Sequence, residues 1–231
     1  YGPFERVLRQ PGTWIAGIDF PFGQSSKFIQ NIGWPDRWAD YVAYAELLGR
    51  KGFCDALQTY RQSRPYGDKE HRRITDIKAG SINPQKLYGV PVGLMFFEGA
   101  PRLIKSGVTV PLLQSGDPTR IVVEAYPGIL ARQFIDRVPY KNDDPRKQSV
   151  AQRQARSHLL DCILKGELEP RYGLRIEAPR DLVDDPAGDR LDALLCAIQA
   201  AWAWTMKECQ YGAPDDVDPN EGWIADPSLR H

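Results

Sequence analysis

The sequence predicts an α/β protein, because two apolar segments that are typical of buried strands alternate with longer segments of helical periodicity. The first strand is expected over residues 14–20, where Pro21 ends it, since proline cannot continue a central strand. The second is expected over residues 120–126, and Pro127 and Gly128 close it. Strands separated by helices indicate one sheet flanked by helices.

Helices account for most of the remaining elements. Pro35 begins a helix that Gly49 ends, and a second helix follows from Phe53 to about Tyr60. A proline within residues 109–113 indicates an edge strand there. Residues 92–106 fit both helix and loop, because a glycine and a proline interrupt their helical spacing. Further helices are expected over residues 128–137, 146–165 and 188–208.

A long basic connection over residues 61–91 interrupts what we interpret as a single domain of residues 1–231. A connection of this length is either functional or mobile, and residues 61–78 could contact a nucleic-acid backbone. Its basic residues are Arg61, Arg64, Lys69, His71, Arg72, Arg73, Lys78 and Lys86.

The composition is that of a folded cytoplasmic protein. No window contains 18 uninterrupted apolar residues, and the first residues do not have the pattern of a signal peptide. The four cysteines form no CxxC pair, so neither a zinc framework nor a disulfide scaffold is indicated. With only three histidines, the sequence does not favour a histidine-rich metal site.

The net charge is zero but unevenly distributed. Residues 181–231 hold 11 Asp and Glu against 3 Lys and Arg, a net of −8, so residues 1–180 carry +8 (27 against 19). This uneven charge fits a solvated acidic tail, or an acidic cluster that binds a metal ion beside a basic surface that binds phosphate. Zero overall charge favours a small or particular substrate over bulk DNA.

Four acidic residues are candidates for chemistry. Asp19 and Glu124 lie in or at the end of apolar strands, where an ionised carboxylate is costly unless it is paired or binds a cation. Asp189 and Asp192 open the last long helix. Together with Cys196 and Gln199 they lie on one face of it, within about 80° of one another. Taken singly, each acid could instead cap a helix or pair with an arginine.

Converging carboxylates would suit Mg²⁺ or Mn²⁺, which prefer oxygen ligands. Two such ions about 4 Å apart could stabilise the attacking and leaving oxygens of phosphodiester hydrolysis. We therefore expect the carboxylates of Asp19, Glu124 and Asp192 within roughly 10 Å of one another, with Asp189 on the same side. Both predicted strands should then lie in one sheet.

Four segments in this order resemble the uncharacterised DUF429 family, whose members are described as predicted nucleases with an RNase H-like fold. They are IAGIDFPFG at residues 15–23, EAYP at 124–127, DRLDALLCAIQAAW at 189–202 and EGWIADP at 221–227. The match runs through most of the chain. The resemblance implies a single RNase H-like domain with a mixed sheet flanked by helices.

The resemblance also implies roles for individual residues. Asp19 would lie on the fourth strand of that fold, Glu124 on the fifth, and Asp189 and Asp192 on the last helix, as catalytic acids. Asp19, Glu124 and Asp192 would hold Mg²⁺ or Mn²⁺. Lys141 belongs to a pair that resembles a family Tyr-Lys pair, and a lysine there could hold a substrate phosphate; a solvated helix face is the alternative.

The chain departs from the family pattern at its beginning. Family members open with a strand that carries a first metal-binding Asp, and nothing before Asp19 matches it. We expect that the opening strands are missing; the alternative is a fold that has lost them. Residues 15–20 should then be unpaired on one side, or covered by something else, and the isolated piece should be poorly soluble.

Three functions fit these observations. The first is a metal-dependent nuclease, a hydrolase in which metal-bound water attacks phosphorus. The second is a non-catalytic protein that keeps the fold and recognises nucleic acid or a nucleotide through Arg and Lys. A nucleotide phosphotransferase ranks last, because the sequence has no glycine-rich phosphate loop.

Overall fold

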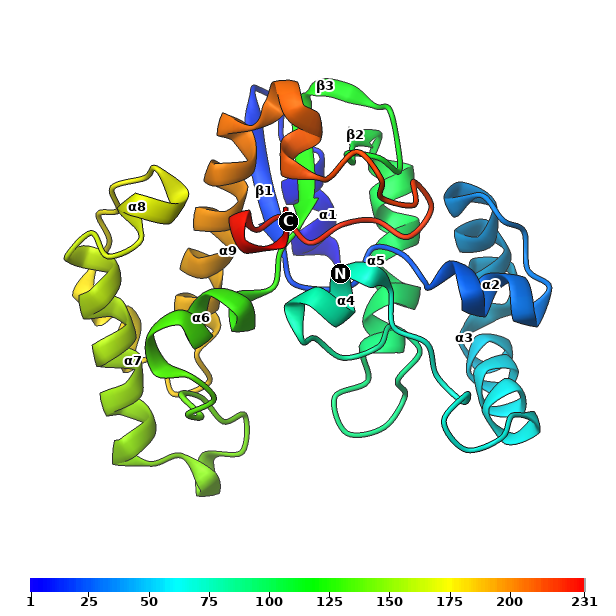
Figure 1. Cartoon of the computed structure of the whole chain (residues 1–231), viewed down its shortest axis with the longest axis horizontal. Coiled ribbons are helices and arrows are strands. Elements are labelled where there is room, and N and C mark those ends of the chain that lie inside the picture. Colours follow the sequence, from blue (N-terminus) through cyan, green and yellow to red (C-terminus); the bar gives the residue numbers. More distant parts are fainter. Residues whose placement is uncertain (231) are drawn as a thin grey trace.

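The computed structural model describes residues 1–230 and confirms the α/β class. Three strands form a parallel sheet in the order β1 (Trp14–Ile18), β3 (Asp117–Glu124) and β2 (Val108–Thr109). A mixed sheet was expected, but all three strands are parallel, because β1 reaches β3 through a long helical crossover. Ile18 pairs with Glu124, so the carboxyl ends of β1 and β3 lie side by side (Figure 1).

Helices surround the sheet and carry the rest of the regular structure. Short 3₁₀ turns lie at Pro145–Lys147, Arg180–Asp184, Lys207–Gly212 and Pro227–Leu229. The α-helices are α1 (Gly2–Leu8), α2 (Ser26–Ile32), α3 (Trp38–Ser63), α4 (Ile74–Ala79), α5 (Val92–Ser106), α6 (Pro127–Ile135), α7 (Val150–Leu164), α8 (Glu169–Tyr172) and α9 (Asp189–Thr205).

The strand β3 lies between two hydrophobic cores. Its side chains alternate between the faces of the sheet, as strand geometry requires. Val122 packs with residues of α1, α3 and α5, whereas Ile121 and Val123 pack with residues of α6, α7 and α9. Figure 1 shows these two groups of helices on opposite sides of the sheet. A strand buried on both faces needs the continuous apolar run that this segment has.

Several element boundaries differ from the sequence predictions. α3 begins at Trp38 and not at Pro35, and Gly49 interrupts it with a non-helical φ of 68° before the helix resumes. Residues 92–106 are helical throughout as α5. The expected strand 109–113 is shorter, because the chain turns back after β2, with a hydrogen bond from the Val110 amide to the Gln114 carbonyl.

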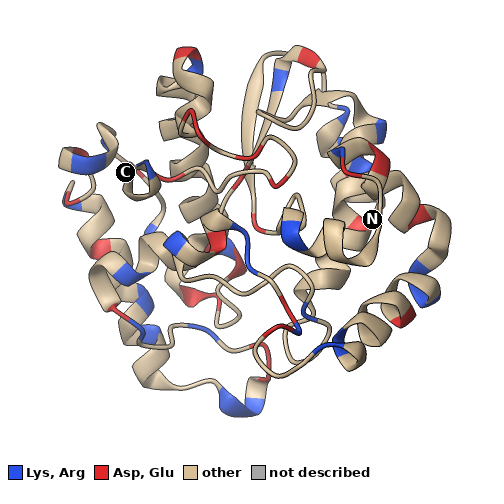
Figure 2. Cartoon of the chain, turned by 45° about the vertical axis from the view of Figure 1, so that its right-hand side comes forward, with Lys and Arg blue, Asp and Glu red and all other residues tan. Residues whose placement is uncertain are grey.

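The basic connection 61–91 is more ordered than the sequence indicated. It contains α4 and a fully buried Arg73, so it is not simply a solvated loop. The acidic last quarter of the chain also has specific partners in the basic part: Arg153 binds Asp184, and Lys141 binds Asp192. Figure 2 accordingly shows positive and negative residues interspersed over the molecule.

β1 lies at an edge of the sheet. Within residues 1–230 its strand partner is β3, which agrees with the expectation that residues 15–20 are unpaired on one side. Helix α9 packs closely against β1. None of the helices in the described part of the chain has the length and apolarity needed to cross a membrane.

Replacing Gly17 in β1 with alanine should destabilise the protein. A Cβ atom there would lie 2.3 Å from the Cys196 carbonyl oxygen of α9, so the strand and the helix would have to separate. We expect a loss of about 1–3 kcal/mol in the free energy of unfolding, measured by urea denaturation. Gly52→Ala, inside α3, is the control and should cost less, because alanine favours helix. Equal stability of Gly17→Ala and the native protein would contradict this close contact.

Candidate functional site

The candidate site lies where β1 and β3 end. Ligands of open parallel sheets commonly bind at the carboxyl ends of strands. Asp19 follows β1, and Asp19 and Tyr126 line two adjacent pockets. The larger, of about 400 Å³, is bounded by α6 and by residues 136–141 and is named the α6 pocket. The smaller, of about 140 Å³, is bounded in part by residues of α5 and is named the α5 pocket.

Asp19 stands at the junction of the two pockets. Solvent reaches it, and no hydrogen bond or ion pair engages its carboxylate within residues 1–230. Crowding by surrounding protein removes part of its water shell and raises its pKa to about 6. The charge of Asp192 raises the pKa further, Lys141 opposes these effects, and Glu124 adds a smaller increase. Such a carboxyl group exchanges protons near neutral pH.

Asp192 is held in place by two neighbours on the far side of the α6 pocket. Its Oδ1 accepts a hydrogen bond of 2.6 Å from the Tyr140 hydroxyl, and its Oδ2 binds the Lys141 ammonium. Burial and the negative charge of Asp192 raise the pKa of the Tyr140 hydroxyl, so this group remains protonated. Burial acts to lower the pKa of Lys141, but the hydrogen bond and charge of Asp192 outweigh it and raise that pKa. The lysine is therefore a cation beside Asp19.

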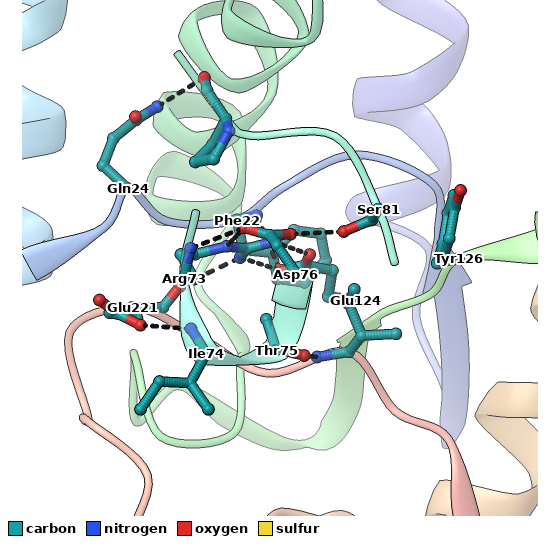
Figure 3. A network of polar contacts seen from close by, with 12 residues as sticks. Phe22, Gln24, Arg73, Ile74, Thr75, Asp76, Ser81, Glu124, Tyr126 and Glu221 are labelled. Carbon is teal, nitrogen blue, oxygen red and sulfur yellow. Dashed lines mark hydrogen bonds and ion pairs between the residues drawn. The ribbon is translucent and has the colours of Figure 1, made fainter. Parts of the chain in front are cut away.

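Glu124 is buried and fully engaged by a different set of partners (Figure 3). Its two oxygens accept hydrogen bonds of 2.6 and 2.8 Å from the Arg73 guanidinium, and the Phe22 amide donates a third of 2.9 Å. Arg73 also donates to both oxygens of Asp76, at 2.8 Å each, and to the Glu221 carbonyl at 3.1 Å. Burial raises the pKa of Glu124, and the neighbouring arginine opposes this rise.

The sequence analysis did not single out Arg73, because it counted this residue among the basic residues of the connection that could contact a nucleic-acid backbone. A local signal was present in the sequence. Asp76 lies three residues after Arg73, and its Oδ2 accepts from the Arg73 amide at the start of α4. An acid at this spacing is typical of a helix N-terminus. The partnership with Glu124, 51 positions away, has no such local signal.

The helix α9 brings only part of its predicted polar face to the site. Asp192 and Cys196 are buried, and the charges of Asp19 and Asp192 add to the effect of burial in raising the pKa of the Cys196 thiol. Gln199 accepts a hydrogen bond of 2.9 Å from the Tyr126 amide. Asp189, by contrast, is exposed at the first residue of α9 and lines neither pocket, because the helix begins beyond the strand ends.

The predicted two-ion metal site does not fit these donors. Among residues 1–230, no group of three or more His, Cys, Asp or Glu side chains is arranged to hold a metal ion. Arg73 neutralises Glu124, and Lys141 neutralises Asp192. Of the three predicted ligands, only Asp19 therefore presents a carboxylate that makes no ion pair within residues 1–230.

Comparisons of the chain with protein-family models, with curated proteins and with solved structures found no match. The resemblance to the DUF429 family therefore depends on the four sequence segments.

Replacing Asp19 with asparagine should stabilise the protein at neutral pH. The folded pKa of about 6 exceeds the ordinary value of 3.8, so ionisation of the native carboxylate lowers the stability of the fold. This loss develops as the pH rises from about 4 to 6. Asparagine removes this cost. Because solvent screens the side chain, we expect a gain of about 1 kcal/mol at pH 7.5 and almost none at pH 4, measured by urea denaturation.

Asp117→Asn provides a control of opposite sign. Hydrogen bonds from Thr119 and Arg120 lower the pKa of Asp117 to about 2, so its ionised form stabilises the folded state above the ordinary pKa. That variant should lose stability at pH 7.5. An equal effect of Asp19→Asn at both pH values would contradict the raised pKa of Asp19.

Proposed function

We propose that the chain is a phosphodiester hydrolase and that it acts in the α6 pocket; the DUF429 resemblance supports this class of reaction, whereas the two-ion site that it implies does not fit the donors described above. The observation that carries this proposal is the position of Asp19. It is an acid with a pKa of about 6, makes no ion pair in the part of the chain that the structure describes, and lies at the carboxyl ends of two parallel strands beside the cation of Lys141. A proton-transfer group beside a cation suits hydrolysis of an anionic ester.

In the proposed reaction, Asp19 acts as a general base. Its carboxylate takes a proton from a water molecule as the water oxygen bonds to phosphorus and the bond to the leaving oxygen breaks; that oxygen keeps the bonding pair and takes a proton from solvent. Lys141 stabilises the charge on the phosphoryl oxygens. Arg137, which is exposed, lines the same pocket and makes no ion pair within the described chain, supplies a second cation. Tyr140 positions Lys141 indirectly through their shared partner Asp192.

A non-catalytic protein that binds a nucleotide or nucleic acid is the second candidate. The neutralisation of Glu124 by Arg73 and of Asp192 by Lys141 favours it, because a metal-dependent nuclease needs carboxylates that are available to ions. The two candidates share the same pocket and differ in whether the bound ester is cleaved.

Hydrolysis of a fluorescent single-stranded oligonucleotide tests the proposal, with Mg²⁺, with Mn²⁺ and with chelator. We expect Lys141→Met to reduce kcat/KM roughly 10²-fold, the effect of removing one group that stabilises developing charge. Lys105→Met is the matched control, because Lys105 pairs with Glu46 on the surface and lines neither pocket. Binding without cleavage under all three conditions would overturn the hydrolase in favour of the binding protein.

A further inference from the structure

The α5 pocket is the second hollow at Asp19, and the reaction proposed above does not use it. Asp19 and Tyr126 line both pockets, so one ligand can extend from the α6 pocket into the α5 pocket across the reacting carboxylate. Its volume of about 140 Å³ is about ten times the space that one water molecule needs. This is room for a single ring system.

The rim of the α5 pocket is apolar and exposed. Ile82, Val90 and Met95 are 40%, 57% and 38% exposed, although all three are large apolar side chains. The buried Phe20 and Ile224 continue this lining inward. Apolar side chains gathered at the mouth of a pocket indicate a ligand that covers them. A planar ring would remove these side chains from water without needing charge.

Apart from Asp19 at the junction with the α6 pocket, the charged side chains and the serine hydroxyl in the wall of the α5 pocket are engaged with one another. Both oxygens of Asp76 accept from Arg73, and the Ser81 hydroxyl donates to Asp76 at 2.7 Å. Both oxygens of Glu124 accept from Arg73 as well. Figure 3 shows this closed set of contacts, which includes no bond to Tyr126. Groups that are already paired have little capacity to read the hydrogen-bonding edge of a ligand ring.

The charges decide which part of a ligand enters which pocket. Arg73 carries one positive charge against the two negative charges of Asp76 and Glu124, so the wall of the α5 pocket disfavours an anion. The α6 pocket is lined by three cations (Arg132, Arg137 and Lys141) against three carboxylates (Asp19, Asp136 and Asp192), and Arg132 and Arg137 make no ion pair within residues 1–230, so it accepts an anion more readily than the α5 pocket does. A ligand with a phosphate at one end and an uncharged planar ring at the other therefore has one orientation that suits both pockets.

We infer that the α5 pocket is a base subsite of the same centre, which holds one nucleobase of the substrate by apolar contact and does not discriminate among the four bases. This inference deepens the proposed function and rests on it for the substrate class. Its occupant is a nucleotide, or one nucleotide of a chain, whose phosphate lies in the α6 pocket beside Lys141 and Arg137.

Calorimetric titration with AMP, GMP, CMP, UMP and ribose 5-phosphate tests the inference. The four nucleotides should bind with Kd values within about threefold of one another, and ribose 5-phosphate at least about tenfold more weakly, because it has no ring to cover the apolar rim. Met95→Gln should weaken all four nucleotides by about threefold or more and leave ribose 5-phosphate unchanged. Leu47→Gln is the matched control, because Leu47 is an exposed apolar residue of α3 that lines neither pocket.

The outcomes separate the subsite from the proposed hydrolysis. Equal affinity for nucleotides and ribose 5-phosphate, more than about tenfold discrimination among bases, or no binding of any of the five ligands would overturn the base subsite. Tighter binding of the nucleotides than of ribose 5-phosphate, without hydrolysis of the oligonucleotide, would retain the subsite and overturn the hydrolase. Hydrolysis without this difference in affinity would retain the hydrolase and overturn the subsite.

Discussion

Arg73→Met should lower the free energy of unfolding by about 3–5 kcal/mol, the largest stability effect that we expect from a single substitution in this chain. Arg73 is 1% exposed and is the shared cation of Asp76 and Glu124, which are also buried. Methionine would fill much of the same volume but leave two carboxylates without their partner. Urea denaturation at pH 7 measures the change.

Two further variants identify the cause of that change. In Arg102→Met the arginine lost is partly exposed and bridges Glu5 and Glu98, so the expected cost is below about 1 kcal/mol. Adding Glu124→Gln to Arg73→Met should restore part of the stability, because it removes one uncompensated buried charge. A cost below about 1 kcal/mol for Arg73→Met itself would show that the carboxylates do not depend on this cation.

Asp19→Asn should reduce the rate of phosphodiester hydrolysis by about 10²–10⁴-fold, the usual contribution of a general base. In the native protein the base is active when deprotonated, so kcat/KM should rise with pH through the Asp19 pKa of about 6 and then level off. Asparagine cannot take the proton, so the residual rate should lack this rise. Steady-state kinetics between pH 5 and 8 would measure both effects.

Asp161→Asn is the control for this kinetic prediction. Asp161 lies on α7, pairs with Arg180 on the surface and lines neither pocket, so its variant should keep the native rate and pH profile. Thermal unfolding of Asp19→Asn tests whether the variant is folded. A folded Asp19→Asn variant with the native rate would remove Asp19 from the reaction.

Much of the fold was predictable because its signals are local. Apolar runs ended by prolines predicted β1 and β3, and their placement in one sheet is confirmed. Helical spacing predicted α6, α7 and α9 to within a few residues. Gly99 and Pro101 inside α5 made that segment ambiguous. Packing of residues such as Phe96 and Leu103 into the core overrides the weak helix propensity of this glycine and proline.

The candidate site was predictable in part. Asp19 and Asp192 stood out because carboxylates are unusual in apolar surroundings, and the structure places both on the α6 pocket with Lys141. The burial of Arg73 was not predictable, because a basic residue in a polar segment is most often solvated. Its position depends on α4, which carries it to the end of β3.

The sequence by itself determined the α/β class, the two principal strands and the acidic residues that need a partner. Those features follow from hydrophobic periodicity and from the cost of burying charge, which act within short stretches of chain. Only the tertiary structure decided that Arg73 partners Glu124 and that Lys141 partners Asp192. It also decided that Asp19 lies between two pockets and makes no ion pair within residues 1–230. These contacts join residues 51 positions apart in each pair, and only chain folding determines which charges meet across that separation.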